Sequence, residues 1–431
     1  MGCVPSPLAS GQLRRIVAGY TINRLGTWFG FVALSVAVFD HTHSAVAVGA
    51  LLLASQVLPA FLVPMLVSHV EMSTRRGELT RLYLFEATTS ALLVVLLIWH
   101  FVLSGVLLLV ALDGTAALAA SALLRAAAAR SAREWVRSVR EPEQREADQG
   151  LELDAERRAN AAINIGFAVT FVLGPALAGV VVPAFGAPVA LLVDMVSFAI
   201  CGAMLLDIRP RVEDAEESSV RERLRAAWAY VSQASMLRRL LLAEAVALAF
   251  FEFSPPIEIA YAKASLHAGD SGYGLLLGTW GLGVAIGSIV FARSIGRSLG
   301  LLLSASTLAV GVSYLGWAAA PTLAIACGAG LVGGVGNGMQ WAALVSAVQR
   351  LTPERLQGQM MGAVESIGAI SPGFGFAIGS AIAALSSPRI AFLVAGIGAS
   401  ATTVAFMRLR IGVRPRSEGA KPETETETVP A

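Results

Sequence analysis

Twelve apolar stretches of about 20 residues run through this chain and constrain its fold more than any other feature. Each is long enough to cross the hydrocarbon core of a bilayer as a helix. The chain of 431 residues is 55% hydrophobic and 14% charged, with a mean hydropathy of +0.68, which exceeds what a water-soluble core needs. We therefore predict an all-α membrane protein with twelve transmembrane helices. The stretches cover residues 14–39, 45–68, 82–101, 103–126, 160–183, 187–207, 238–262, 272–292, 299–319, 322–348, 361–385 and 389–409.

The cations lie almost entirely on one side of the predicted membrane. Of the 32 lysine and arginine residues, Arg24 lies inside the first stretch, and only Lys263 and Arg389 fall in connections on the opposite side. Because positively charged connections stay in the cytoplasm, we expect a multi-pass protein of the cell membrane with both termini cytoplasmic. The formal net charge of +2 gives no indication of nucleic-acid binding. The three cysteines show no disulfide or metal-binding spacing.

The chain divides into two halves that resemble each other. Glu156 precedes Gly174-Pro175 in the fifth stretch, and Glu354 precedes Pro372 at the equivalent place in the eleventh. A parallel six-plus-six repeat is typical of transporters. The predicted units are an N-terminal half over residues 1–209, a cytoplasmic linker over 210–237, a C-terminal half over 238–410 and a disordered cytoplasmic tail over 411–431.

The fifth stretch carries small residues on one face of its predicted helix. They recur at every fourth position, which lets a neighbouring backbone approach closely. Pro175 removes a backbone donor and predicts a kink about one turn earlier. The simpler interpretation is a tightly packed helix pair with no direct role in function. The small residues are Ala162, Gly166, Thr170, Gly174 and Ala178, followed by Gly179.

Four segments resemble the major facilitator superfamily, in particular its branch similar to enterobactin and macrolide exporters. Residues 22–61 are similar in order and spacing to the first two helices of that branch, and residues 336–362 to its tenth helix and the following loop. The run from Gly174-Pro175 to Gly179 resembles the Gly-Pro-x-x-Gly-Gly motif of proton-coupled exporters. The turn after the second stretch keeps the acid and the last two arginines of the superfamily's cytoplasmic gate, at Glu71, Arg75 and Arg76, but lacks its glycines.

Ionisable residues within the predicted spans are candidates for the functional site because their burial in lipid is costly. Arg24 and Asp113 lie at similar depth on helices that line the central cavity in the resembled family, so they are able to pair. A purely structural ion pair is the alternative. Glu244 and Glu252 are about 80° apart around one helix, so both are expected to face the cavity. Glu365 lies one turn inside the eleventh stretch.

Glu252 is the first candidate for a proton carrier because its own helix offers no cation nearby. Its neighbours Phe250, Phe251 and Phe253 are able to stack on a cargo molecule, although aromatic residues in a span more often pack or face lipid. Three further acids rank lower because they are able to reach a surface or a partner: Glu86, Asp194 and Glu258.

The leading functional prediction is a secondary active transporter that exports amphipathic organic molecules, such as drugs, macrolides or siderophores, in exchange for protons. We expect a monomer in contact with membrane lipid, whose partners are a neutral or cationic organic substrate and protons, with no cofactor and no metal. The alternatives are a lysophospholipid flippase and a transporter-like scaffold or sensor that no longer cycles. An enzyme is not expected, since no set of nucleophile and base stands out.

Overall fold

The computed structural model describes residues 9–61, 77–139, 149–208, 230–294, 296–353 and 356–409. All regular secondary structure within these ranges is helical. The N-terminal bundle consists of α1 (Gly11–Thr42), α2 (Ala45–Leu52) continued by the π-helical turn η2 (Leu53–Val57), α4 (Glu78–Trp99), α5 (Leu103–Val139), α6 (Gln149–Phe185) and α7 (Ala187–Met204). The C-terminal bundle consists of α9 (Ser235–Phe251), α10 (Ser254–Ala260) and the π-helical turn η4 (Tyr261–Ser265), then α11 (Gly269–Arg293), α12 (Leu299–Ala319), α13 (Leu323–Leu351), α14 (Gln357–Leu385) and α15 (Pro388–Met407).

Ten helices in the described part are long and apolar enough to cross a membrane. The other two predicted spans are also helical. The second is a shorter apolar helix, Ala45–Phe61, at the end of a described range. The tenth is α13, which has 29 residues but is rich in glycine and contains Asn337 and Gln340, and these lower its hydropathy. The prediction of an all-helical membrane protein is therefore confirmed.

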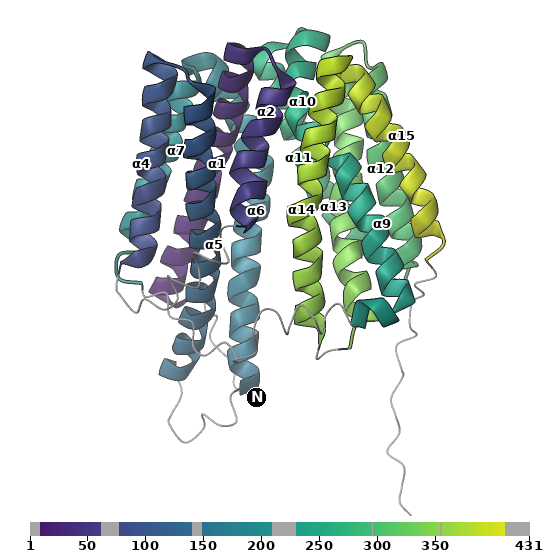
Figure 1. Cartoon of the computed structure of the whole chain (residues 1–431). Coiled ribbons are helices and arrows are strands. Elements are labelled where there is room, and N and C mark those ends of the chain that lie inside the picture. The colour runs from purple at the N-terminus through teal and green to yellow at the C-terminus, as the bar shows by residue number, and fades with distance from the viewer. Residues whose placement is uncertain are drawn as a thin grey trace, which may run out of the picture.

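The helices form two bundles that stand side by side (Figure 1). In the first, α1 packs on α6 and α7, and α4 packs on α5 and α7; in the second, α12 packs on α13 and α15, and α9 packs on α14 and α15. The helix pairs α6 with α11 and α2 with α14 join the bundles, and α2 also packs on α10. The fifth segment of each bundle thus meets the second segment of the other. This reciprocal pairing is the spatial form of the repeat in the sequence.

Glycines allow the two joining pairs to approach at backbone contact. Gly179 of α6 lies directly on Gly274 of α11, so a Cβ on either would overlap the partner's Cα. Gly49 of α2 lies on Ser380 of α14, where a Cβ would be 2.7 Å from the serine Oγ. Both contacts are close to the end of the molecule that carries the turn between α1 and α2. We call this the upper end, since it is at the top of Figure 1.

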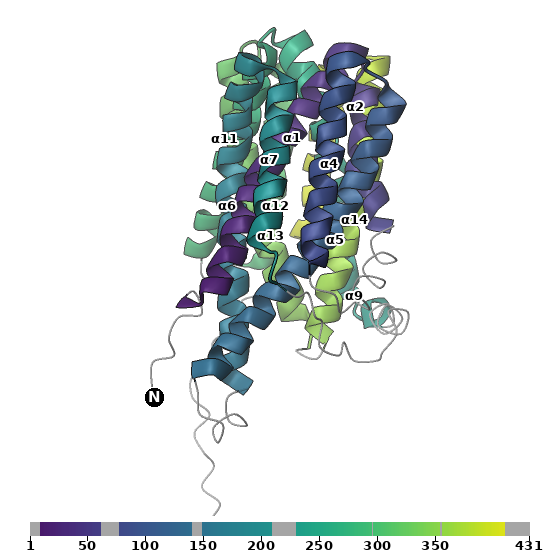
Figure 2. The same cartoon turned by 90° about the vertical axis from the view of Figure 1, so that its left-hand side faces the viewer.

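At the opposite end, which we call the lower end, α5 and α6 extend beyond the other helices (Figures 1 and 2). Each has 37 residues. At about 1.5 Å per residue each measures about 55 Å, well beyond the roughly 30 Å of a hydrocarbon core. Their lower parts therefore project from the membrane as an antiparallel pair.

Candidate functional site

The seventh segment is interrupted where Glu252 lies. Helix α9 ends at Phe251 and α10 begins at Ser254, and two prolines follow at once, Pro255 and Pro256. Proline has no N–H, so the carbonyl of Phe251 loses its helical donor. The hydroxyl of Tyr314 on α12 donates to that carbonyl at 2.7 Å instead. The break is therefore satisfied by a side chain of the C-terminal bundle, as a helix interruption at membrane depth requires.

Glu252 is half-buried at this break and lies against α14. A Cβ at Gly375 would come within 2.5 Å of the Cβ of Glu252, so the glycine makes the contact possible. Glu258 lies further along the same segment, is buried, and interacts electrostatically with Glu252. The hydroxyl of Ser254 donates to one oxygen of Glu258, and the other oxygen has no hydrogen-bond partner among the described residues. The interrupted segment thus carries two carboxyl groups, Glu252 and Glu258, although Glu258 was ranked below Glu252 as a candidate in the sequence analysis.

Glu244 does not share an exposed face with Glu252. Its side chain is 2% exposed and accepts a hydrogen bond at 3.0 Å from the amide of Gln340 on α13. The carbonyl oxygen of that amide accepts at 2.9 Å from the hydroxyl of Thr307 on α12. Glu244 is therefore held inside the C-terminal bundle by a chain of hydrogen bonds, which corrects the expectation that both acids face the cavity.

Asp113 and Arg24 do not form the pair considered from the sequence. Asp113 of α5 accepts a hydrogen bond at 2.5 Å from Thr89 of α4. The guanidinium of Arg24 lies 5.2 Å from the ring centroid of Phe167 on α6. No ion pair between Arg24 and a carboxylate is present among the described residues. The two residues share a depth in the membrane but point to different neighbours.

Two further acids lie inside the N-terminal bundle, where the sequence had expected them to reach a surface or a partner. Glu86 of α4 is fully buried, and neither of its carboxylate oxygens has a hydrogen-bond partner in the described part. Asp194 of α7 is 6% exposed and lies against Gly30 of α1, where a Cβ would collide with it. Glu86 interacts electrostatically with both Asp113 and Asp194. Thus α4, α5 and α7 each contribute one acid to the interior of this bundle.

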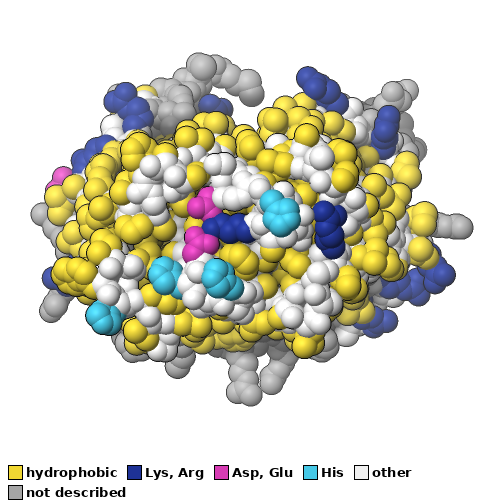
Figure 3. All heavy atoms as spheres, turned by 90° about the horizontal axis from the view of Figure 1, so that it is seen from above, with side chains coloured by type: hydrophobic (Ala, Val, Ile, Leu, Met, Phe, Trp, Pro, Cys, Tyr) yellow, Lys and Arg dark blue, Asp and Glu magenta, His cyan; other side chains and the backbone are white. Residues whose placement is uncertain are grey.

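A charged cluster joins the bundles at the upper end. Lys263 of η4 forms ion pairs with Asp40 of α1 and, at 2.5 Å, with Asp270 of α11. Figure 3, which looks down on this end, shows a basic side chain between acidic ones near the centre of the face. Beside the cluster is a cavity of about 180 Å³, lined among others by Asp40, His41 and Asp270. The upper end is therefore closed by charge as well as by the glycine contacts.

The second cation of the upper end, Arg389, contacts residues of the C-terminal bundle. Its guanidinium donates to the carbonyls of Ala318 at 3.0 Å and Ser265 at 3.4 Å. It also lies 5.8 Å from the ring centroid of Tyr261. Arg389 thus satisfies carbonyls where α12 and η4 end.

The remaining predicted residues are the small residues of α6, which the structure describes, and the gate residues and Glu365, whose side chains it does not. The small face of α6 meets two different helices: Gly166 lies on Thr21 and Gly174 on Trp28, both on α1, whereas Gly179 meets α11. Helix α6 continues through Pro175. The predicted gate residues Glu71, Arg75 and Arg76 lie outside the described residues, as does the side chain of Glu365.

Two reciprocally paired six-helix bundles are the architecture of the major facilitator fold, which is found in membrane transporters. Residues 240–431 match the family model described as Major Facilitator Superfamily. Comparison with curated protein sequences finds no match.

Several solved structures are similar to this chain over nearly its whole length. They include the nucleoside transporter NupG, with 12% identity and a TM-score of 0.69 over 93% of this chain and 99% of that chain. A bacterial homologue of the iron transporter ferroportin in an inward-facing state has 17% identity and a TM-score of 0.67 over 93% and 98%. The POT family transporter PepTSo has 12% identity and a TM-score of 0.61 over 92% and 96%. At these identities the likeness establishes the fold, and it confirms the predicted architecture.

Proposed function

We propose that this protein is a secondary active transporter that exports amphipathic organic molecules in exchange for protons. The transporter fold and the reciprocal contacts between the bundles support alternating access, in which the bundles rock about a site between them. The uneven distribution of cations supports an orientation in which the upper end is outside the cell. On this assignment, the described conformation is closed to the exterior by the contacts of Gly179, Gly49 and Lys263.

The orientation has a direct test in reporter fusions. A reporter that is active only in the cytoplasm is expected to give signal when fused in the connection near Glu143 and none when fused near His267. Signal at His267 would reverse the orientation and, with it, the assignment of the closed side.

The observation that carries proton coupling is the position of Glu252 at a broken helix that touches α14. No cation pairs with Glu252 or Glu258 in the described part, and the one nearby lysine, Lys263, is engaged by two aspartates at the upper end. Keeping an unpaired carboxylate charged in a low-dielectric interior is costly, whereas water in an open cavity stabilises the charge. A change in access to Glu252 would therefore be linked to binding or release of a proton.

Transport in everted membrane vesicles tests this function. An imposed proton gradient is expected to drive uptake of at least one compound from a panel of drugs, macrolides, siderophores and lysophospholipids. Uptake should stop when the gradient is collapsed with a protonophore. Absence of gradient-dependent uptake for every compound in the panel would contradict the proposal and favour a protein that no longer cycles.

A lysophospholipid flippase is the second candidate, and one observation favours it. Arg24 and Arg125 lie inside or close to the predicted spans of the N-terminal bundle without an acidic partner among the described residues. Such cations suit a cargo with an anionic headgroup better than the neutral or cationic cargo expected from the sequence.

A further inference from the structure

Two arginines converge where α1, α5 and α6 meet. Arg24 of α1 is half-buried; its Nε is inaccessible and has no hydrogen-bond partner in the described structure. Arg125 of α5 lies 5.9 Å from the ring centroid of Tyr20 on α1 and donates a hydrogen bond at 3.3 Å to Asn164 on α6. The two guanidinium groups interact electrostatically with each other. The site therefore contains two like charges whose described contacts are rings and a neutral amide.

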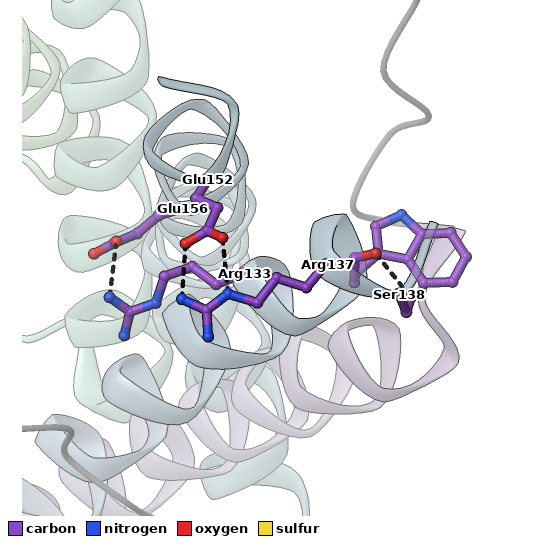
Figure 4. Close-up of polar contacts among 6 residues, drawn as sticks. Arg133, Arg137, Ser138, Glu152 and Glu156 are labelled. Carbon is purple, nitrogen blue, oxygen red and sulfur yellow. Dashed lines mark hydrogen bonds and ion pairs between the residues drawn. The ribbon is translucent and has the colours of Figure 1, made fainter. Parts of the chain in front are cut away.

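The same pair of helices shows how arginines are neutralised elsewhere. Below Arg125, the interface of α5 and α6 holds Arg137 with Glu152 at 2.8 Å and Arg133 with Glu156 at 3.9 Å (Figure 4). Residues 152, 156 and 164 of α6 all face α5, as their contacts with Arg137, Arg133 and Arg125 show. Where the pair leaves the membrane the acceptor is glutamate, whereas at Arg125 it is Asn164. Among the described residues, Arg125 is thus without a counter-charge, whereas Arg133 and Arg137 on the same helix have one.

Two like charges without an acidic partner among the described residues favour the binding of an anion. The guanidinium of Arg24 is partly removed from water, so a second positive charge nearby, on the more exposed Arg125, adds to the cost of keeping Arg24 charged. Guanidinium groups in membrane spans are normally paired or mark a substrate pathway. An oxyanion between Arg24 and Arg125 would offset this cost, because guanidinium binds phosphate, sulfonate and carboxylate through paired N–H donors.

An aromatic surface adjoins the arginines. Phe167 lies under Arg24 and is 36% exposed, and its ring centroid is 5.8 Å from that of Phe171. Phe171 in turn contacts Trp28, one turn above Arg24 on α1, at 5.2 Å. These three rings continue upward along the seam between α1 and α6 from the charged site. A ligand with an anionic group and an apolar body matches this order of surfaces.

We propose that Arg24 and Arg125 bind the anionic group of an amphipathic molecule whose apolar part lies along Phe167, Phe171 and Trp28. This inference rests on the proposed transport function, because it names the chemistry of the cargo. The anionic group belongs to a phosphate, sulfonate or carboxylate, carried either by a membrane lipid or by a water-soluble compound. The cargo is therefore anionic at one end, which replaces the expectation of a neutral or cationic molecule.

Equilibrium binding to the full-length protein in phosphatidylcholine nanodiscs tests the proposal without a proton gradient. The probes share one ring system: naphthalene-1-sulfonate, 1-naphthalenemethanol and 1-naphthylmethylammonium. We expect the sulfonate to bind at least about tenfold more tightly than the other two. Each of Arg24→Gln and Arg125→Gln should weaken sulfonate binding about tenfold or more and leave binding of the alcohol unchanged, because loss of one charge-assisted pair has about this effect.

The chain offers a matched control in Arg133, whose charge is paired with Glu156. Arg133→Gln is expected to leave binding of all three probes unchanged. Arg24→Lys and Arg125→Lys keep the charge and should retain selectivity for the sulfonate at reduced affinity, which separates loss of charge from misfolding. Equal binding of the three probes by the wild type would overturn the proposal, as would equal weakening of sulfonate binding by Arg133→Gln.

The source of the anion follows from a second arm of the same experiment. When phosphatidylglycerol replaces part of the phosphatidylcholine, competition with the sulfonate assigns the site to a lipid headgroup, and unchanged sulfonate binding assigns it to a water-soluble anion. Both results support the anionic site. Selective binding without gradient-driven transport would contradict the proposed function alone, and transport without selective binding would contradict this inference alone.

Discussion

Replacing Gly179 with alanine tests whether the contact of α6 with α11 holds the upper end closed. The added Cβ would overlap the Cα of Gly274, far inside the optimum carbon–carbon separation of about 3.5–4.0 Å. The obstacle is backbone, so it cannot swing aside like the end of a flexible side chain. The two helices must separate, and overpacking of this kind costs about 1–3 kcal/mol. Because the cost falls on the upper-closed state, the equilibrium should shift toward the upper-open state by about 5- to 150-fold.

The shift is measurable as cysteine accessibility at the other joining pair. Ser380 is 3% exposed and lies against Gly49, so Ser380→Cys is a nearly isosteric reporter that is far from Gly179 in sequence and on another pair of helices. In a background in which Cys3, Cys201 and Cys327 are alanine, we expect Gly179→Ala to raise the rate of labelling by a membrane-impermeant maleimide at least fivefold or so.

A glycine of the same helix provides the control. Gly150 of α6 has no neighbouring atom within 4 Å of an added Cβ. Gly150→Ala therefore adds a methyl group to the same helix without the clash. Its labelling rate should equal that of the parent protein. An unchanged rate for Gly179→Ala, or an equal increase for both variants, would refute the reasoning.

Two further substitutions test the polar contacts. Tyr314→Phe leaves the carbonyl of Phe251 without its donor, which should destabilise the protein by about 1–3 kcal/mol in thermal unfolding. The control Tyr230→Phe removes a hydrogen bond to a less buried carbonyl and should cost less. Equal losses of stability for the two variants would contradict a special role for Tyr314 at the helix break. Lys263→Gln leaves Asp40 and Asp270 without their shared cation, so the rate of Ser380→Cys labelling should rise, but by less than in Gly179→Ala, and added salt should reduce the increase. An unchanged labelling rate at low salt would exclude Lys263 from closing the upper end.

The helices were predictable from sequence because hydrophobic length determines where a span fits. The ninth span was expected at 299–319 and is observed as Leu299–Ala319. Small residues on α6 predicted close packing, but not the partner helices. Gly174 meets α1 and Gly179 meets α11, although both lie in the same short motif. A periodic pattern indicates which face packs, whereas the neighbour depends on the arrangement of the whole bundle.

The polar contacts were harder to predict because depth in the membrane does not specify direction. Arg24 and Asp113 share a depth, yet Asp113 bonds to Thr89, a short hydroxyl that carries no charge signal in the sequence. Glu258 was expected to reach a surface or to pair with a nearby group; it does not reach a surface, and it accepts a hydrogen bond from Ser254. The π-helical turn Tyr261–Ser265 prolongs that segment and leaves Glu258 buried. The ion pairs of Lys263 were not predicted, because the sequence indicates only the side of the membrane on which this cation lies.

Gradient-driven transport by the Glu252→Gln protein tests the central claim most directly. In everted vesicles, wild-type protein should accumulate its substrate under an imposed proton gradient. It should also exchange labelled for unlabelled substrate without a gradient. Glu252→Gln cannot release a proton, so we predict that accumulation is lost while exchange and substrate binding remain. If Glu252→Gln still concentrates substrate against its gradient at the wild-type rate, the proton is carried elsewhere and the assigned role of the broken seventh segment is wrong.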